Sequence, residues 1–414
     1  MGQKESSIRD DSFNSESKSN VKTGSNNTIK TARGRYDDQL LKRCENVYFD
    51  VEAWYRIIQS ETFYTEFIPI SPSIAQAFVN FYQTRYSSTK LLNFNDIQLI
   101  TSIQNQLKEQ IFNSKTNKFQ SNGTFIRLSS RSPKDGKPLD YQKISQFYNQ
   151  KLNELQVQYL DEYKSIEGKA NMQMIAYCYA QFHSLKVTDE IQAFNLILSS
   201  ERVYYDLIEV LDCQQVKDNK VANINNIKLH DWNNNIIIRE WNNLLDPSME
   251  FRCFVYQSKL TAISQYDYYC KYYHLQNNGI VQQIKITIIK YWQEKIQPLL
   301  NPLPEKYSNY VIDIGLIENK LTNEYDCIVI EMNPFETSTG ASLFNWTTDS
   351  DQLRGQENEI EIRVQSDYYP YIKDYIEFIL EVNQCDGKEN SSSVDHGKEP
   401  YFIFLDQMKT QFSL

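Results

Sequence analysis

The sequence predicts an α+β fold in which helices come first and antiparallel strands follow. Apolar residues recur at helical spacing from about residue 38 to residue 211. The pattern then changes to short apolar runs, beginning with Ile236-Ile237-Ile238, that turn residues separate. Because helices and strands are segregated rather than alternating, we expect antiparallel sheets and not a series of βα units.

The helical half begins with two helical patterns within residues 38–83. Residues 67–73 separate them, and Pro69 and Pro72 favour an extended connector there. Further helical patterns follow at residues 93–111, at 142–181, where the length favours a helical hairpin, and at 189–211, which predicts one helix.

The second half predicts strands joined by short turns. Two of them, 250–255 and 260–265, flank turn residues at 257–259 and should form a hairpin. The remaining elements are a strand at 236–241, a Tyr-rich segment at 266–273, a helix at 279–297, a hairpin at 311–335 and a helix at 369–382.

Composition narrows the functional classes. The chain of 414 residues has a formal net charge of -10 and a pI near 5.1, which argues against nucleic acid as a partner because duplex binding needs a concentrated basic face. Its apolar runs all fall short of the roughly 18 residues of a spanning helix, and its N-terminus lacks the apolar core of a secretory signal. We therefore expect a cytoplasmic protein.

Cysteine and histidine give no sign of a metal or nucleophilic site. The seven cysteines are widely spaced without a Cys-x-x-Cys pair, which is typical of free thiols in a reducing compartment. The four histidines are equally scattered. We expect each of these residues to serve packing or the surface.

The first 35 residues consist largely of Ser, Asn, Lys and Thr and predict a disordered tail. This tail begins Met-Gly-Gln-Lys-Glu-Ser, which places Gly2 and Ser6 where N-myristoylation requires them. One myristoyl chain binds membrane weakly and reversibly. We expect at most a loosely membrane-associated fraction, and the alternative is an unmodified tail.

The hairpin at 311–335 carries three oxygen ligands. Glu331 and Asn333 project to one face of their strand, and Asp313 on the facing strand can join them. Mg²⁺ prefers one or two carboxylates together with waters and substrate phosphates, so this trio favours a magnesium–nucleotide site. The alternative is an edge hairpin with ordinary solvated acids.

Two other stretches could bind phosphate or base. Residues 125–136 read as a strand that ends in a basic, hydroxyl-rich loop, and Arg, Lys and Ser are suitable phosphate donors. Arg239-Glu240-Trp241 ends an apolar strand and could contact adenine, with Arg252 on the next strand reaching phosphates. For residues 125–136 the alternative is a solvated turn or a phosphorylation target. For Arg239-Glu240-Trp241 and Arg252 the alternative is a cross-strand salt bridge. Walker and Rossmann glycine motifs are missing from the sequence.

In their order along the chain, these motifs resemble the cell division cycle protein 123 family. The likeness spans most of residues 50–350. The motifs that carry it are Arg-Leu-Ser-Ser-Arg-Ser-Pro-Lys-Asp at 127–135, Ile-Arg-Glu-Trp at 238–241, Glu-Phe-Arg-Cys-Phe-Val at 250–255, Ile-Ser-Gln-x-Asp-Tyr at 263–268, Asp313, and Glu-Met-Asn-Pro-Phe at 331–335.

The resemblance implies an ATP-grasp-like fold, with two α+β lobes and antiparallel sheets that enclose a nucleotide cleft. The N-terminal lobe would take residues 36–235 with a helical insertion at about 140–180, the C-terminal lobe 236–382, and a linker with a short tail 383–414. The implied site comprises metal ligands Asp313, Glu331 and Asn333, phosphate contacts Arg127 and Arg252, loop residues Ser130, Ser132, Lys134 and Asp135, and adenine-hinge residues Arg239, Glu240 and Trp241.

The implied function is that of an assembly chaperone for eukaryotic translation initiation factor 2. It would bind Mg²⁺ and ATP, and its partner would be the gamma subunit of that factor. Where the family commonly has Lys-Leu-Asn-Trp-Ser-Ala-Pro, residues 127–133 read Arg-Leu-Ser-Ser-Arg-Ser-Pro, so an aromatic contact is lost. The alternative is an ATP-grasp ligase or phosphotransferase, although no His or Cys can be assigned as its catalytic base. A third interpretation is a scaffold with an inactive nucleotide pocket.

Overall fold

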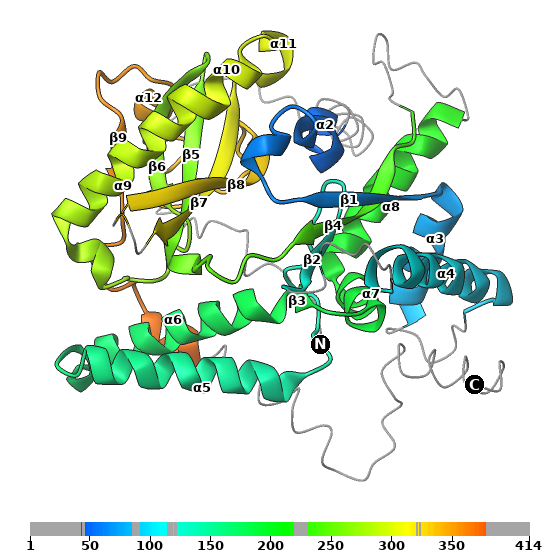
Figure 1. The fold of residues 1–414 in the computed structure, drawn as a ribbon, viewed down its shortest axis with the longest axis horizontal. Helices are drawn as coiled ribbons and strands as arrows, with labels where there is room; N and C mark the ends of the chain where they lie inside the picture. Colours follow the sequence, from blue (N-terminus) through cyan, green and yellow to red (C-terminus); the bar gives the residue numbers. More distant parts are fainter. Residues whose placement is uncertain are drawn as a thin grey trace, which may run out of the picture.

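The computed structural model describes residues 43, 46–84, 92–113, 119, 122–218, 231–319, 322 and 324–377. The predicted N-terminal tail with Gly2, and the predicted linker and tail at 383–414, lie outside these residues. The described chain forms two lobes, each built on its own sheet (Figure 1). The predicted α+β fold with two lobes and largely antiparallel sheets is confirmed.

The first lobe is built on a four-stranded antiparallel sheet in the order β1-β4-β2-β3. Apolar faces of four helices cover this sheet and form one core with it. The strands are β1 (Thr65–Ile70), β2 (Thr124–Leu128), β3 (Lys186–Val187) and β4 (Asn234–Glu240); the helices are α3 (Pro72–Thr84), α4 (Phe94–Leu107), α7 (Glu190–Ser199) and α8 (Glu201–Asp218).

The second lobe has a five-stranded sheet in the order β8-β7-β5-β6-β9, in which only the short β9 is parallel to its neighbour. Helix α9 (Asn278–Tyr291) packs on this sheet through Ile284 and Ile288, and the helical path continues through η7 (Trp292–Ile296) to α10 (Gln297–Leu300). The strands are β5 (Glu250–Tyr256), β6 (Lys259–Gln265), β7 (Tyr310–Asn319), β8 (Glu324–Pro334) and β9 (Glu361–Arg363).

Strand β4 joins the two cores. Side chains alternate faces along a strand, so Ile236 and Ile238 enter the first core while Ile237 between them enters the second. The structure thus places β4 in the first sheet, whereas the sequence had grouped residues from 236 onward with the second lobe. The strand is therefore one of the elements that join the two lobes.

The predicted helical hairpin consists of α5 (Tyr141–Gln158) and α6 (Ile166–Ser184). It leaves the first sheet after β2 and returns to it at β3, but its buried residues Leu155, Met172 and Met174 belong to the core of the second lobe. In Figure 1 the hairpin lies along the second lobe, and one end of it reaches the first lobe near β3. It therefore bridges them, as does α2 (Val51–Tyr55), whose Trp54 enters the second core.

Two further sequence predictions need correction. The expected connector at 67–73 is largely strand β1, which tolerates Pro69 because it is an edge strand. The single helix expected at 189–211 is two helices. They are separated at Ser200, whose backbone is extended (φ -81°, ψ 120°) and whose hydroxyl accepts from the Val203 amide, so that a new helix begins there.

The predicted turn between β5 and β6 is confirmed. Gln257 and Ser258 have φ of 50° and 56°, the left-handed pair that a two-residue hairpin turn requires. Their amides donate to Asn309 Oδ1 and to the Ser308 carbonyl, both at 2.8 Å, which holds this uncommon conformation in residues other than glycine.

Short helices complete the described chain, and none of the helices in that part is long and apolar enough to cross a membrane. The remaining elements are η1 (Val47–Phe49), η2 (Gln59–Glu61), η3 (Lys108–Phe112), η4 (Glu162–Lys164), η5 (Pro247–Met249), η6 (His274–Gln276), α11 (Pro304–Tyr307) and α12 (Ser350–Leu353).

Candidate functional site

Three of the predicted site residues lie side by side on the second sheet. Register pairs Arg252 on β5 with Asp313 on β7, and Asp313 with Glu331 on β8. Directly opposite residues of neighbouring strands share a face of the sheet, so these side chains form one row. Arg127, on β2 of the first sheet, reaches the end of this row and makes the cluster an interlobe site.

Arg252 and Asp313 form the centre of the row. Arg252 Nε and Nη2 donate to the two Asp313 carboxylate oxygens, both at 2.8 Å, in the planar two-point geometry that favours Arg over Lys. The remaining Arg252 nitrogen, Nη1, donates to the Gly340 carbonyl at 2.6 Å. Asn333 Nδ2 lies 3.3 Å from Asp313 Oδ2, so the predicted amide ligand joins the same carboxylate.

Glu331 is held from the other lobe. Arg127 Nη1 donates to Glu331 Oε1 at 2.6 Å, and Arg127 Nε donates to the Leu128 carbonyl at 3.1 Å. Burial alone would raise the pKa of the Glu331 carboxyl, but the charges of Arg127 and Lys134 outweigh it and lower the pKa to about 2. Glu331 is therefore ionised throughout the physiological pH range.

Lys134 brings the basic loop into the cluster. Its ammonium donates to Tyr266 Oη at 2.7 Å and lies 4.8 Å from the centroid of the Tyr266 ring, and the Arg252 guanidinium lies at the same distance from that ring. Burial would lower the pKa of Lys134, but Tyr266, Glu250 and Glu331 together raise it. The ammonium of this half-buried residue thus stays charged.

The charge of the cluster determines which ligand fits. Arg127, Lys134 and Arg252 face two ion-paired carboxylates, those of Asp313 and Glu331. Glu250 is a third acid at the cluster, and burial is the main reason that its carboxyl pKa is raised. Three cations therefore face two ion-paired carboxylates here, which favours an anion over a bare metal ion.

A magnesium ion alone would compete with arginines for its oxygen ligands. Among the described residues, there is no group of three or more His, Cys, Asp or Glu side chains that could hold a metal. Asp313, Glu331 and the amide oxygen of Asn333 are suitable hard ligands for Mg²⁺ when phosphate oxygens and water supply the others. The residues fit a magnesium–polyphosphate pair, because the phosphates would give the arginines new partners as the metal takes the carboxylates.

Other residues of the predicted loop are tied to the first lobe. Ser130 Oγ donates to the Asp206 carboxylate, with oxygens at 2.7 and 2.8 Å. Asp135 accepts from Ser200 Oγ at 2.5 Å and from the Arg202 amide at 3.1 Å, at the beginning of α8. Ser132 is buried in the same loop. The structure thus brings Lys134 to the cluster and uses Ser130 and Asp135 to hold the loop against α8.

The expected adenine hinge is also largely engaged within the protein. Arg239 donates to the Thr62 hydroxyl at 2.7 Å and to the Ile330 carbonyl of β8, and burial with the nearby Arg127 charge lowers its pKa. The amides of Glu240 and Trp241 donate to carbonyls in the first lobe. The Trp241 ring is buried against Phe182, with centroids 4.9 Å apart, and its buried Nε1 has no hydrogen-bond partner among the described residues. That indole N–H is a donor for which a ligand could supply an acceptor.

Sequence reasoning assigned no role at the site to Glu250 or to the Tyr266 hydroxyl. Glu250 precedes Arg252 by two residues on the same strand, so strand alternation alone places both on one face. Tyr266 belongs to the Tyr-rich segment at 266–273, for which packing was the favoured role and a partner surface the alternative. In the structure Tyr272 is buried, and Tyr269 packs edge-to-face on Tyr369, so this segment mainly serves packing.

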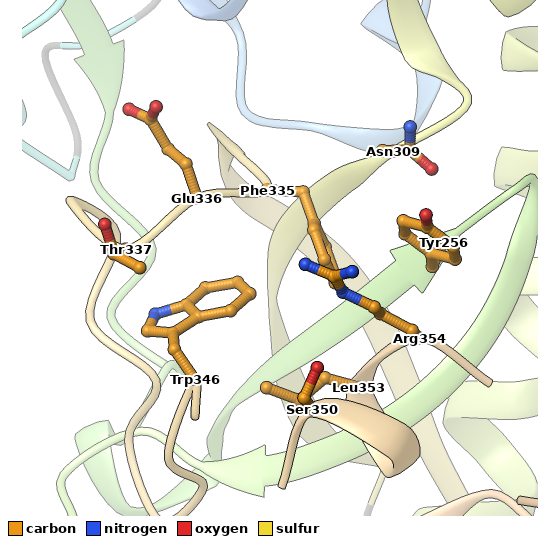
Figure 2. A pocket seen from close by; sticks show the side chains of 9 residues that line it. All are labelled: Tyr256, Asn309, Phe335, Glu336, Thr337, Trp346, Ser350, Leu353 and Arg354. Carbon is orange, nitrogen blue, oxygen red and sulfur yellow. The ribbon is translucent and has the colours of Figure 1, made fainter. Parts of the chain in front are cut away.

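A separate pocket of about 240 Å³ lies on the second lobe beyond the end of β8 (Figure 2). Its lining includes none of the predicted site residues. Phe335 and Trp346 form an aromatic wall there, with ring centroids 4.9 Å apart. The lining residues are Tyr256, Asn309, Phe335, Glu336, Thr337, Trp346, Ser350, Leu353 and Arg354.

This chain matches one family model and is similar to relatives that share a name. A family model described as D123 matches residues 54–373. A Dictyostelium discoideum protein named translation initiation factor eIF2 assembly protein is 30% identical over 165 residues, which are 40% of this chain and 37% of that protein. A Xenopus laevis protein of the same name is 31% identical over 173 residues, 41% of this chain and 44% of that protein. The chain thus spans less than half the length of these two relatives.

Among solved structures, Cdc123 from Schizosaccharomyces pombe is similar at 19% sequence identity with a TM-score of 0.46. The alignment covers 80% of this chain and 98% of that one.

Proposed function

The chain belongs to the D123 family, and on that premise we propose that it is a Mg–ATP-binding assembly factor for eukaryotic translation initiation factor 2. The observation that carries the nucleotide part is the interlobe cluster, in which Arg127, Lys134 and Arg252 converge from both lobes on the row of Asp313 and Glu331. The cluster has more cationic side chains than ion-paired carboxylates. Oxygen ligands suitable for a metal ion lie beside these cations.

In this proposal Arg127, Lys134 and Arg252 contact the phosphates. Asp313, Glu331 and Asn333 hold the magnesium ion, which shields phosphate charge when it is bound. The free protein keeps each carboxylate neutralised by an arginine. Binding of Mg–ATP exchanges these partners, so a ligand that carries both charges is preferred over either ion alone.

The client part rests on the relatives, whose name is translation initiation factor eIF2 assembly protein. We propose the gamma subunit as the direct partner, which is what the family resemblance of the sequence implies. ATP binding is the proposed requirement, and no residue is assigned as a catalytic acid or base. The proposed location is the cytoplasm, with a loosely membrane-held fraction if Gly2 is myristoylated.

The test is a binding assay between purified full-length protein and purified gamma subunit, with Mg–ATP, with ATP and excess EDTA, and with neither. The proposal expects capture of the gamma subunit that Mg–ATP strengthens and that Asp313→Asn weakens. Failure to capture it under all three conditions would contradict the client assignment. ATP turnover stimulated by a metabolite, together with that failure, would support a ligase or phosphotransferase.

A further inference from the structure

Two cysteines lie close together where the helical hairpin meets the second lobe. Cys178 is on α6, Cys270 is in the segment that follows β6, and their sulfur atoms are 3.7 Å apart. Both are free thiols in this structure. A disulfide bond brings sulfurs to about 2.05 Å, so a closure of under about 2 Å would join them.

The surrounding contacts hold both cysteines in register. Asn171, two helical turns before Cys178 on α6, donates to the Lys271 carbonyl and accepts from the Lys271 amide, both at 2.9 Å. Gln265 Nε2 donates to the Cys270 carbonyl at 2.6 Å from the other side. The two thiols therefore face each other across a contact that is already fixed without a covalent bond.

We propose that Cys178 and Cys270 are a disulfide-forming modification site, for which hydrogen peroxide is the oxidant. Cys178 is half-buried and Cys270 is fully buried, so peroxide reaches the Cys178 sulfur first. That sulfur takes one peroxide oxygen to become a sulfenic acid, and the first water leaves. The Cys270 sulfur then attacks the Cys178 sulfur, and the hydroxyl departs as a second water.

The two steps consume one peroxide and two thiols and yield one disulfide and two waters. The thiol pair loses two electrons, which the peroxide gains. A dithiol reductant reverses the reaction by thiol–disulfide exchange. Burial raises the pKa of the Cys270 thiol well above its usual range, so this thiol seldom ionises to attack peroxide itself.

The disulfide bond would add a covalent connection between the two lobes. Helix α6 ends at Ser184, only two residues before β3 of the first sheet, whereas Cys270 follows β6 of the second sheet. A covalent link between them ties the hairpin, and through it the first sheet, to the second lobe. It also closes a loop of about 90 residues, a length at which cross-links restrict the unfolded chain strongly.

The experiment treats reduced full-length protein with a small excess of hydrogen peroxide, blocks remaining thiols with N-ethylmaleimide, and maps peptides by mass spectrometry without reduction. The expected product is a peptide pair linked through Cys178 and Cys270, together with a rise in melting temperature of a few degrees that dithiothreitol reverses. Cys178→Ser should lose both effects. Cys327→Ser is the matched control, since Cys327 is also half-buried, and should keep both.

Because a polar atom at position 270 could disturb the core, Cys270→Ala serves as the second variant and should lose the linked peptides while it keeps the melting temperature of the reduced protein within a few degrees. Alkylation of both thiols after peroxide treatment would overturn the proposal. So would sulfinic acid on Cys178 without a linked peptide, or a disulfide to another cysteine. None of these readouts depends on nucleotide or client binding.

Discussion

Arg252 and Asp313 form a two-point ion pair inside the second lobe, with both nitrogen–oxygen distances at 2.8 Å. The Asp313 side chain is 1% exposed and that of Arg252 is 10% exposed. Removal of one partner leaves a buried charge without compensation. We therefore expect Arg252→Met to lower the free energy of unfolding by about 3–5 kcal/mol, measured by urea denaturation at pH 7.

Lys164 provides the control, since it is paired with Asp161 at 2.6 Å with side chains that are 69% and 94% exposed. Lys164→Met should cost about 1 kcal/mol or less. The double variant Arg252→Met/Asp313→Asn should recover part of the loss, because no unpaired charge remains. Equal costs for the buried and exposed pairs would contradict this interpretation.

Glu331 tests the nucleotide proposal. Glu331→Gln keeps the size of the side chain and removes a proposed metal ligand, so the affinity for Mg–ATP should fall by at least roughly tenfold in isothermal titration calorimetry. Asp326→Asn is the control, because Asp326 lies exposed on the same strand and should leave affinity unchanged. If both variants bind Mg–ATP as the unchanged protein does, Glu331 is not a metal ligand.

A variant of Asp135 can distinguish a structural role of this residue from a nucleotide-binding role. Its carboxylate accepts two hydrogen bonds at the beginning of α8. Asp135→Ala should therefore lower the free energy of unfolding by about 1–2 kcal/mol while the affinity for Mg–ATP stays within about twofold. A loss of affinity as large as that of Glu331→Gln would instead place Asp135 at the nucleotide, as the sequence resemblance implied.

His183 should make stability depend on pH. It packs against Phe147 and Trp241, and burial lowers its imidazole pKa from 6.5 to about 4. The unfolded chain binds a proton below pH 6.5 more readily than the native protein does, so the contribution of His183 to stability is present above 6.5 and is lost as pH falls from 6.5 to 4.

The variant His183→Phe isolates this effect. Glu52 has a pKa raised to about 7, mainly by burial, and titrates in the opposite direction, but it is present in both proteins. The stability of the unchanged protein relative to His183→Phe should therefore decrease from pH 7 to pH 5 in urea denaturation. A difference between the two proteins that is constant with pH would show that His183 does not titrate on unfolding in this range.

The N-terminus offers a simple chemical test. If Gly2 is myristoylated, the N-terminal peptide of protein from eukaryotic cells should lack Met1 and carry the mass of a myristoyl group. Gly2→Ala should abolish the modification, because the acyl group is attached to the amine of glycine. Recovery of retained Met1, or of an unmodified Gly2, would exclude the lipid.

The predictions from the sequence were most accurate where the local residue pattern and the tertiary contacts favour the same element. Hydrophobic periodicity placed the α5–α6 hairpin, and turn residues placed the β5–β6 hairpin. The row of Arg252, Asp313 and Glu331 was foreseeable because each lies on a strand whose face the alternation fixes. These features depend on neighbours in the sequence and on one strand pairing.

Other features depend on partners that are distant in the sequence. The break at Ser200 is stabilised by Asp135 from the loop after β2, and strand β1 exists because β4 pairs with it despite Pro69. Tyr266 receives its role from Lys134, 132 residues earlier. No local pattern reports such contacts, and helical periodicity runs across Ser200 without interruption.

The outer side of β8 has a consequence for solubility. As an end strand of its sheet, β8 would present unpaired backbone groups to other molecules. Its Val329 carbonyl instead accepts from the Thr62 hydroxyl, and the Ile330 carbonyl accepts from Arg239. The opposite end strand, β9, is three residues long. A strand from another molecule would have to break these hydrogen bonds to add at β8, and it would find few backbone partners at β9. Both features protect the sheet from edge-to-edge aggregation.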